Sequence, residues 1–369
     1  MPIAPIDPNE HRHAQVALRF GAPVVLMAIL AACFSGCSTV SFYVQAANGQ
    51  AEILNKARPL EKVMLDQRTP ERVRRKLALV QELRQFAGQR LGLPAERNYG
   101  RYSDLGRRYV VWVVYAAPEF SVEGKTWSYP LVGTLEYRGF FSKKAADEEV
   151  AALRAAGFEV YSDGVEAYST LGWFRDPVLN MFLDRSDSEL AELIFHELTH
   201  VKLFVPGDTD FNEAFATANA EAGVRRWLKS KGDSRGLARY DKALTREREI
   251  VQLLLGAREK LKQLYARASL SPEEMRRQKA DIIAAMRREY ADIRRRWGVS
   301  GRRDEVFARP WNNARLNTVA TYYDLVPGFE RLLKEKGGDL NAFYAAVKEM
   351  RNLSEEQRKS VLKVAPATR

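Results

Sequence analysis

Two histidines stand four residues apart in the segment His196-Glu197-Leu198-Thr199-His200, and the sequence around them predicts one continuous helix. Ser186-Asp187-Ser188-Glu189 has the pattern of a capping box, at which such a helix begins, and Pro206-Gly207 ends it at about Phe204. A spacing of four places both imidazoles on one face of the helix, one turn apart. Both rings can therefore reach a single metal ion.

These residue types are the ones that a zinc site needs to activate water. A catalytic zinc ion takes three protein ligands and keeps a fourth position open. Glu197 sits one residue further around the helix than His196, too far aside to ligate the ion but able to hold a water whose pKa zinc lowers toward roughly 7. We expect His196 and His200 to bind Zn2+ and Glu197 to act as the general base of a hydrolytic reaction.

Glu213 is the predicted third ligand. It follows the short loop 205–210 and lies in the first turns of a second helix, which such a loop folds antiparallel to the first. Ala216, Thr217 and Ala220 share its face, and these small side chains let the two helices approach closely. The alternative is that Glu213 only completes a capping box that begins at Asp210.

Further residues are candidates for supporting roles at the metal site. Glu192, one turn before His196, is the alternative ligand or an outer partner of the metal site. Glu221 and Asn212 are further outer candidates, because a zinc-bound imidazole usually needs a partner on its other nitrogen. With no spare histidine to stabilise an oxyanion, a tyrosine must serve, and Tyr168 and Tyr322 are the candidates.

The small number of histidines strengthens the interpretation of the motif as a metal site. The chain has four histidines, and His11 and His13 fall in a segment that we expect to be removed. The mature protein would then keep only the two histidines of the motif. The alternative is a pair of core histidines without a function.

The first 36 residues have the layout of a lipoprotein signal peptide. Arg12 and Arg19 precede an apolar run, 22–34, which is too short to span a bilayer but has the length of a signal-peptide hydrophobic region. This run leads to Ser35-Gly36-Cys37, which resembles the lipobox, in which a cysteine is lipidated and becomes the mature N-terminus. An uncleaved anchor helix is the alternative.

Either Cys33 or Cys37 could be the lipidated cysteine. Cys33 has the better residue three positions before it, Leu30, whereas Cys37 gives the longer hydrophobic region and is followed by Ser38 and Thr39. We favour Cys37 and a protein anchored to the bacterial cell envelope, on the periplasmic face of the inner or outer membrane. No cysteine follows residue 37, so packing rather than disulfides must hold the fold together.

The charge of the chain favours anionic surfaces such as phospholipid headgroups, since the formal net charge is +11 and the pI is near 9.5. The Arg and Lys residues are spread along helical stretches among many Glu and Asp, with no Arg/Gly block or basic block interleaved with aromatics. This pattern argues against a nucleic-acid partner.

The predicted fold class is α+β and mainly helical, a zincin-like core with a small sheet and an inserted helical hairpin. Helical patterns cover 44–93, where Thr69 and Pro70 read as N-cap and first helical residue. β-branched and aromatic runs then predict strands at 109–115, 131–137 and 159–161, with a helix at 143–156 crossing between two of them. Residues 37–369 are expected to form one unit, with the small sheet at about 107–162, the metal helix pair at 186–229, the hairpin at 235–297 and C-terminal helices at 310–362.

Several segments spread along the chain match those of a known family. They are residues 43–50, 111–112, 116–121, 137–141, 167–174, 194–200, 211–216 and 312–314. The chain resembles a bacterial family of predicted zinc aminopeptidases, lipoproteins with a His-Glu-x-x-His core, over nearly all of its mature length. The resemblance implies aminopeptidase activity and supports Cys37 as the lipidated residue. The family leads us to expect cysteines near 127–130 and 133–134, where this chain has Ser128 and Thr134, so a bridge between them would be lost here.

Three functions remain compatible with the sequence. The first is a membrane-tethered zinc peptidase, acting on chain ends or within chains. The second is a zinc hydrolase of another amide, such as a cell-wall peptide, which the same chemistry would support. The third is a non-catalytic envelope scaffold in which the metal staples the helix pair. The intact Glu197 argues against the third, because a structural site has no use for a water-activating base.

Overall fold

A computed structural model describes residues 37–129, 133–166, 175–298, 304, 307–323 and 325–363. These residues are mainly helical and contain small sheets, so the α+β class is confirmed. The chain divides into two compact units, residues 1–50 and 51–369. Helix α2 is described over Cys37–Lys56 and so includes the cysteine favoured for lipidation, whereas Cys33 and the predicted signal peptide lie outside the described residues. None of the described helices combines the length and the apolar character needed to cross a bilayer.

The second unit begins with β1 (Arg58–Pro59), α3 (Leu60–Leu65) and α4 (Glu71–Leu91). The prediction that Thr69 caps α4 is wrong, because Pro70 occupies the N-cap position. The Thr69 hydroxyl instead donates to the carbonyl of Val63, at 2.7 Å, and so closes the turn between the two helices.

Two of the described sheets have three strands each. Strand β2 (Arg101–Ser103) pairs antiparallel with β1 and parallel with β8 (Val178–Leu179). The larger sheet has the order β6-β3-β7, with every pair antiparallel. Its strands are β3 (Val111–Pro118), β6 (Arg138–Phe140) and β7 (Phe158–Val165).

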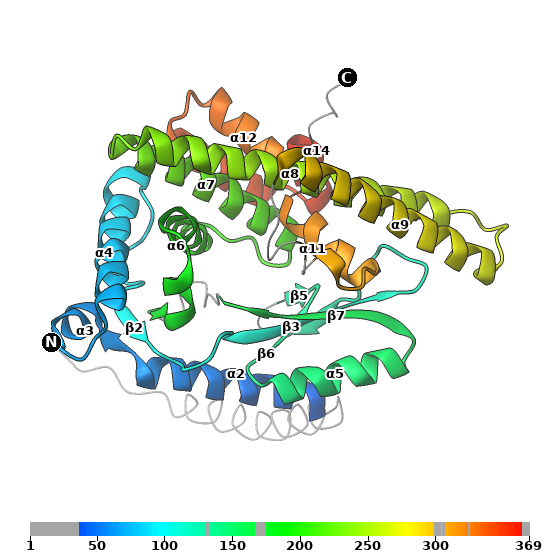
Figure 1. Ribbon diagram of the computed structural model, residues 1–369, viewed down its shortest axis with the longest axis horizontal. Coiled ribbons are helices and arrows are strands. Elements are labelled where there is room, and N and C mark those ends of the chain that lie inside the picture. The colour runs from blue at the N-terminus through cyan, green and yellow to red at the C-terminus, as the bar shows by residue number, and fades with distance from the viewer. Residues whose placement is uncertain are drawn as a thin grey trace, which may run out of the picture. The chain divides into compact units, whose positions relative to one another are not determined.

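The side chains on the two faces of β3 pack into two different hydrophobic cores. Val114 and Ala116 pack with Ala146 and Leu153 of α5 (Lys143–Ala155), the predicted crossing helix. The alternate residues Val111, Val113, Tyr115 and Ala117 join the main core, to which the metal-motif helix also contributes. Figure 1 shows α5 along one side of this sheet, with the helices of the motif on the other side.

A short hairpin replaces most of the strand predicted at 131–137, the first two residues of which lie outside the described residues. Strand β4 (Trp127–Tyr129) pairs antiparallel with β5 (Gly133–Leu135). Ser128 and Thr134 stand directly opposite each other, and their hydroxyl oxygens lie 3.1 Å apart. The two positions at which the family leads us to expect cysteines are thus neighbours across the hairpin, and here they are joined by a hydrogen bond.

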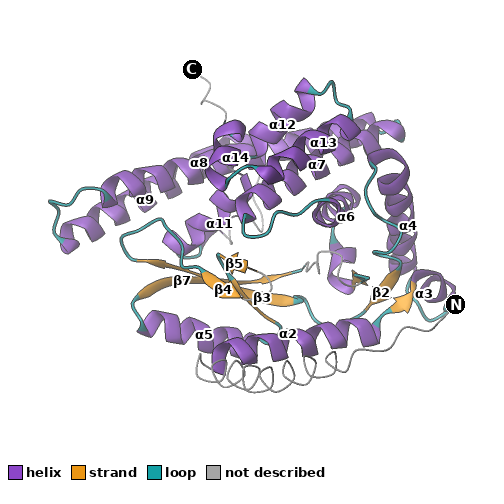
Figure 2. Cartoon of the chain, turned by 180° about the vertical axis from the view of Figure 1, so that it is seen from behind, coloured by secondary structure: helices purple, strands orange, loops and turns teal. Residues whose placement is uncertain are grey.

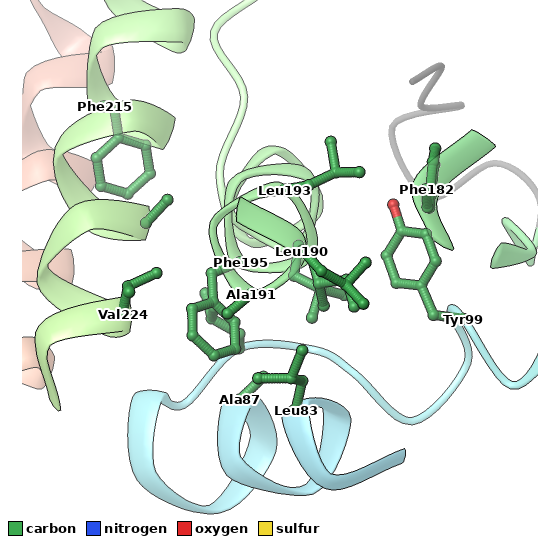
Figure 3. Close-up of a cluster of buried hydrophobic side chains, with 14 of the residues drawn as sticks. Leu83, Ala87, Tyr99, Phe182, Leu190, Ala191, Leu193, Phe195, Phe215 and Val224 are labelled. Carbon is green, nitrogen blue, oxygen red and sulfur yellow. The ribbon is translucent and has the colours of Figure 1, made fainter. Parts of the chain in front are cut away.

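The predicted metal helix pair is present as α6 (Asp187–Lys202) and α7 (Thr209–Ser230), preceded by the short helix η1 (Asn180–Asp184). Leu83 and Ala87 of α4 pack against Leu190, Ala191 and Phe195 of α6 (Figure 3). Gly223 of α7 lies where these helices meet, and a Cβ there would come within 2.9 Å of the side chains of Leu91 and Phe195. A glycine at this position therefore allows the close packing of α4, α6 and α7.

The predicted hairpin consists of α8 (Ser234–Tyr265) and α9 (Pro272–Trp297), which share a separate apolar cluster with Leu316 of the following helix. Ser271 caps α9 by accepting a hydrogen bond from the Glu274 amide at 3.2 Å. Figure 2 shows the C-terminal helices gathered beside α7. They are α11 (Asn313–Tyr323), α12 (Val326–Glu335), α13 (Leu340–Glu349), η2 (Met350–Asn352) and α14 (Glu355–Leu362).

Candidate metal centre

Helix α6 carries the motif on a well-defined helical start. The Ser186 hydroxyl accepts a hydrogen bond from the Glu189 amide, and the Glu189 carboxylate accepts one from the Ser186 amide at 2.9 Å, which completes the predicted capping box. Because Phe195 faces the core, His196 and His200 lie on another face of the helix. His200 is buried, and His196 is partly exposed.

Three side chains converge on one point between α6 and α7. The Nε2 atoms of His196 and His200 lie 3.1 Å apart, and Glu213 places Oε2 at 3.2 Å from His196 Nε2 and Oε1 at 3.6 Å from His200 Nε2. Bonds of about 2.0–2.1 Å from a tetrahedral ion separate its ligand atoms by about 3.3 Å. The observed distances therefore fit one small cation, and two imidazoles with one carboxylate suit zinc.

The turn between the two helices brings Glu213 to this point. Asp208 caps α7 by accepting a hydrogen bond from the Phe211 amide at 3.1 Å, so the alternative capping box from Asp210 is wrong. Asn212 binds both backbone groups of Val205, at 2.8 Å each. Its contact is thus with the loop rather than with an imidazole, and it fixes the turn from which Glu213 projects.

The C-terminal helix also holds this turn. Arg358 of α14 donates to the Asp208 carboxylate at 2.7 Å, and both side chains are buried. Lys359 pairs with Asp210 at 3.1 Å and is more exposed. The ligand-bearing turn therefore depends on residues about 150 positions away in the chain.

A buried polar chain joins α6 to α7 beside the ligands. The amide of Asn219 donates to the Thr199 hydroxyl at 2.7 Å, and that hydroxyl donates to the carbonyl of Phe195. Tyr344 of α13 donates to Asn219 and to the carbonyl of Leu91. Our sequence reasoning missed these residues, although a lone asparagine in the alanine-rich stretch of α7 is a signal for a buried hydrogen bond.

The electrostatics of the cluster favour an ionised Glu213. Burial alone would raise the pKa of its carboxyl, but the nearby His200 and the hydrogen bond with His196 hold the pKa far below its ordinary value. Burial lowers the pKa of His200, and Glu213 more than reverses this, so the net shift is upward. The carboxylate is thus kept in the form that a metal ion requires.

The other predicted outer residues are not brought to the imidazoles. Glu192 accepts a hydrogen bond from the Tyr240 hydroxyl at 2.9 Å, and Glu221 pairs with Arg248 at 2.5 Å and with Arg225 at 3.5 Å. Glu213 rather than Glu192 is the acidic residue that joins the two histidines. The buried Nδ1 atom of His200 has no hydrogen-bond partner among the described residues.

Burial raises the pKa values of Glu192 and Glu221 to about 7, which makes stability depend on pH. The folded protein holds these protons more tightly than the unfolded chain, whose carboxyls titrate near their ordinary pKa of 4.5. The tighter proton binding adds to the free energy of unfolding. This contribution is complete below pH 4.5 and is lost as the pH rises through about 7.

Glu192→Gln is therefore expected to reduce the loss of stability between pH 5 and 8. At pH 8 the variant should be more stable than the parent by about 1–3 kcal/mol, because a neutral amide avoids the buried charge and still accepts from Tyr240. Urea unfolding at both pH values measures the effect, with the exposed Glu356→Gln as the control. An unchanged pH dependence in Glu192→Gln would contradict the assignment.

The roles of the two candidate oxyanion tyrosines stay predictions. Tyr168 lies outside the described residues, and Tyr322 belongs to α11. Two other buried tyrosines lie near the cluster. The pKa of Tyr115 is raised by burial, then by Tyr137 and Glu213, and that of Tyr99 by burial, then by Glu197 and Asp176. Both phenols therefore keep their protons at neutral pH.

Comparison with known proteins gives one result. A family model described as "Putative aminopeptidase" matches residues 41–362, which include every residue of the cluster. Neither the curated proteins nor the solved structures contain a significant match.

Proposed function

Because the chain belongs to the family of putative aminopeptidases, we propose that it is a zinc-dependent peptidase with its active site at His196, His200 and Glu213. The observation that carries this proposal is the convergence of two imidazoles and one carboxylate at distances that fit a single ion. The core around α6 and α7 is then of the zincin-like type.

The chemistry divides between the ion and the protein. A zinc ion, when bound, lowers the pKa of water and polarises the scissile carbonyl. His196, His200 and Glu213 hold the ion. Glu197 is buried beside them, accepts the proton of the attacking water and passes it to the leaving amine. The buried hydrogen bond between Thr199 and Asn219 joins the two helices that carry these residues.

We further propose that the protein is a lipoprotein of the bacterial envelope, anchored through Cys37. The apolar run at 22–34 and the small residues before Cys37 support this location. The basic net charge would hold the anchored protein near anionic lipid. Mass spectrometry of the native protein should find an acylated cysteine at its N-terminus, and an unmodified Met1 would contradict the anchor.

Metal content tests the ligand set. Purified protein should hold about one zinc ion per chain, and His200→Ala should release it, because two remaining ligands bind zinc weakly. Glu192→Gln is the matched control, since Glu192 lies on the same helix but binds Tyr240, and it should keep the zinc. Full zinc in purified His200→Ala would count against this site.

Peptide profiling tests the reaction. The zinc-loaded protein is expected to cleave peptides with a free N-terminus and to leave their N-acetylated counterparts intact. Cleavage of acetylated peptides alone would replace the aminopeptidase with an endopeptidase. Hydrolysis of cell-wall peptides in place of linear peptides would assign the same chemistry to another amide.

A further inference from the structure

Tyr99 has a backbone conformation that tyrosine rarely adopts. Its φ is 57°, the one positive value at a non-glycine position among the described residues. The left-handed region costs a residue with a Cβ about 1–2 kcal/mol, and glycine or asparagine would adopt it more easily. Such strain persists only where the surrounding structure enforces it.

Hydrogen bonds from distant segments enforce this turn. The Tyr99 amide donates to the carbonyl of Asp176 at 2.7 Å, and the side chain of the preceding Asn98 accepts from the Asp176 amide at 3.1 Å. Arg84 of α4 donates to the carbonyl of Asn98 at 2.8 Å. The turn is thus fixed between α4 and the segment that leads to β8, and its side chain is aimed in one direction.

The side chain is aimed at the face of α6 that carries the proposed base. Tyr99 is 3% exposed, and its ring centroid lies 6.4 Å from that of Phe182. Figure 3 shows the ring beside α6, on the side from which Leu190 and Leu193 project. Glu197 follows these leucines by seven and four residues, so it lies on the same side of the helix. The influence of Glu197 on the pKa of Tyr99 agrees with this proximity.

Packing alone does not explain a tyrosine here. A phenylalanine would give the same contact with Phe182 without burying a hydroxyl, and a hydroxyl is costly to bury unless it is hydrogen-bonded. A phenol that keeps its proton is a hydrogen-bond donor, and the neighbouring carboxylate of Glu197 is an acceptor. The two groups therefore have complementary chemistry at the position where the reaction needs an oriented base.

We propose that Tyr99 is a positioning residue, whose hydroxyl orients the Glu197 carboxylate for proton transfer through a hydrogen bond relayed by one water. This inference rests on the proposed function of Glu197. The strained turn is kept because it delivers the phenol to this carboxylate.

Tyr99→Phe separates orientation from packing, because it keeps the ring and removes only the hydroxyl. On a panel of aminoacyl-4-nitroanilides, kcat is expected to fall about 10–100-fold, with KM, zinc content and Tm unchanged. Tyr102→Phe is the matched control: Tyr102 is also buried, and the charges nearest it are Asp104 and Asp184, so kcat should stay the same. A kcat within twofold of the parent in Tyr99→Phe, or a loss that merely follows lost zinc or lowered Tm, would overturn the proposal.

Acetohydroxamate binding gives a readout that does not depend on turnover. This probe chelates the ion and shares a proton with a neighbouring carboxylate, so its affinity reports the orientation of Glu197. Tyr99→Phe is expected to weaken its binding about tenfold, and Tyr102→Phe to leave it unchanged. Equal affinity in parent and Tyr99→Phe would overturn the role of Tyr99.

The two readouts also separate this inference from the proposed function. If the zinc-loaded parent cleaves no amide, the proposed function fails, and hydroxamate affinity still decides whether Tyr99 orients Glu197. If the parent is active and Tyr99→Phe matches it in kcat and hydroxamate affinity, only the inference fails. A parent that binds no zinc overturns both.

Discussion

Glu197→Gln is expected to lower kcat for peptide hydrolysis by about 10²- to 10⁴-fold while zinc stays bound. Glutamine has nearly the same shape as glutamate, so the packing around this buried side chain is preserved. It cannot accept a proton, so the attacking water would lose its base. Zinc content and steady-state kinetics on one free-N-terminus peptide measure the two effects in the same preparation.

The control for this variant is Glu192→Gln, the same chemical change one turn before His196 on the same helix. It removes a carboxylate that binds Tyr240 and is not one of the three proposed metal ligands. The kcat should therefore remain within about threefold of the parent. Full activity in Glu197→Gln would move the base to another residue. Loss of zinc in that variant would instead make Glu197 part of the ligand set.

Arg358→Met is expected to lower the free energy of unfolding by about 3–5 kcal/mol. Arg358 and Asp208 are 8% and 3% exposed, so removal of the arginine leaves a buried carboxylate without its counter-charge. Since Asp208 caps the helix that carries Glu213, zinc affinity should fall as well. Urea unfolding of the zinc-free protein and competition with a zinc chelator measure the two quantities.

Two further variants sharpen this experiment. Lys359→Met breaks the more exposed pair with Asp210 and should cost less than about 1 kcal/mol. Asp208→Asn combined with Arg358→Met removes both charges and keeps a good helix cap, so it should recover part of the lost stability. A cost below about 1 kcal/mol in Arg358→Met alone would show that the buried pair does not hold the turn.

The cluster could be predicted largely because its determinants are local. A spacing of four on a helix fixes the relation between His196 and His200, and the capping box at Ser186 fixes where that helix begins. Glu213 could be predicted since the short turn at 205–208 leaves the second helix little choice but to run back along the first.

Contacts between distant segments could not be predicted in this way. Glu192 binds Tyr240, 48 residues later, and Glu221 binds Arg248, 27 residues later. Tyr99 could not be assigned to the site from sequence, because its backbone conformation is imposed by Asp176 and Arg84 rather than by its neighbours. No local pattern records such partners.

The ion pair between Arg358 and Asp208 also sets an order of events during synthesis. A ribosome that has just completed α7 at Ser230 has made both histidines and Glu213, yet Arg358, which pairs with the cap of α7, still lies 128 residues ahead. A nascent chain therefore carries the three proposed ligands before it carries the ion pair that fixes the turn of Glu213. If the proposed function holds, a chain truncated before α14 should bind zinc more weakly than the full chain.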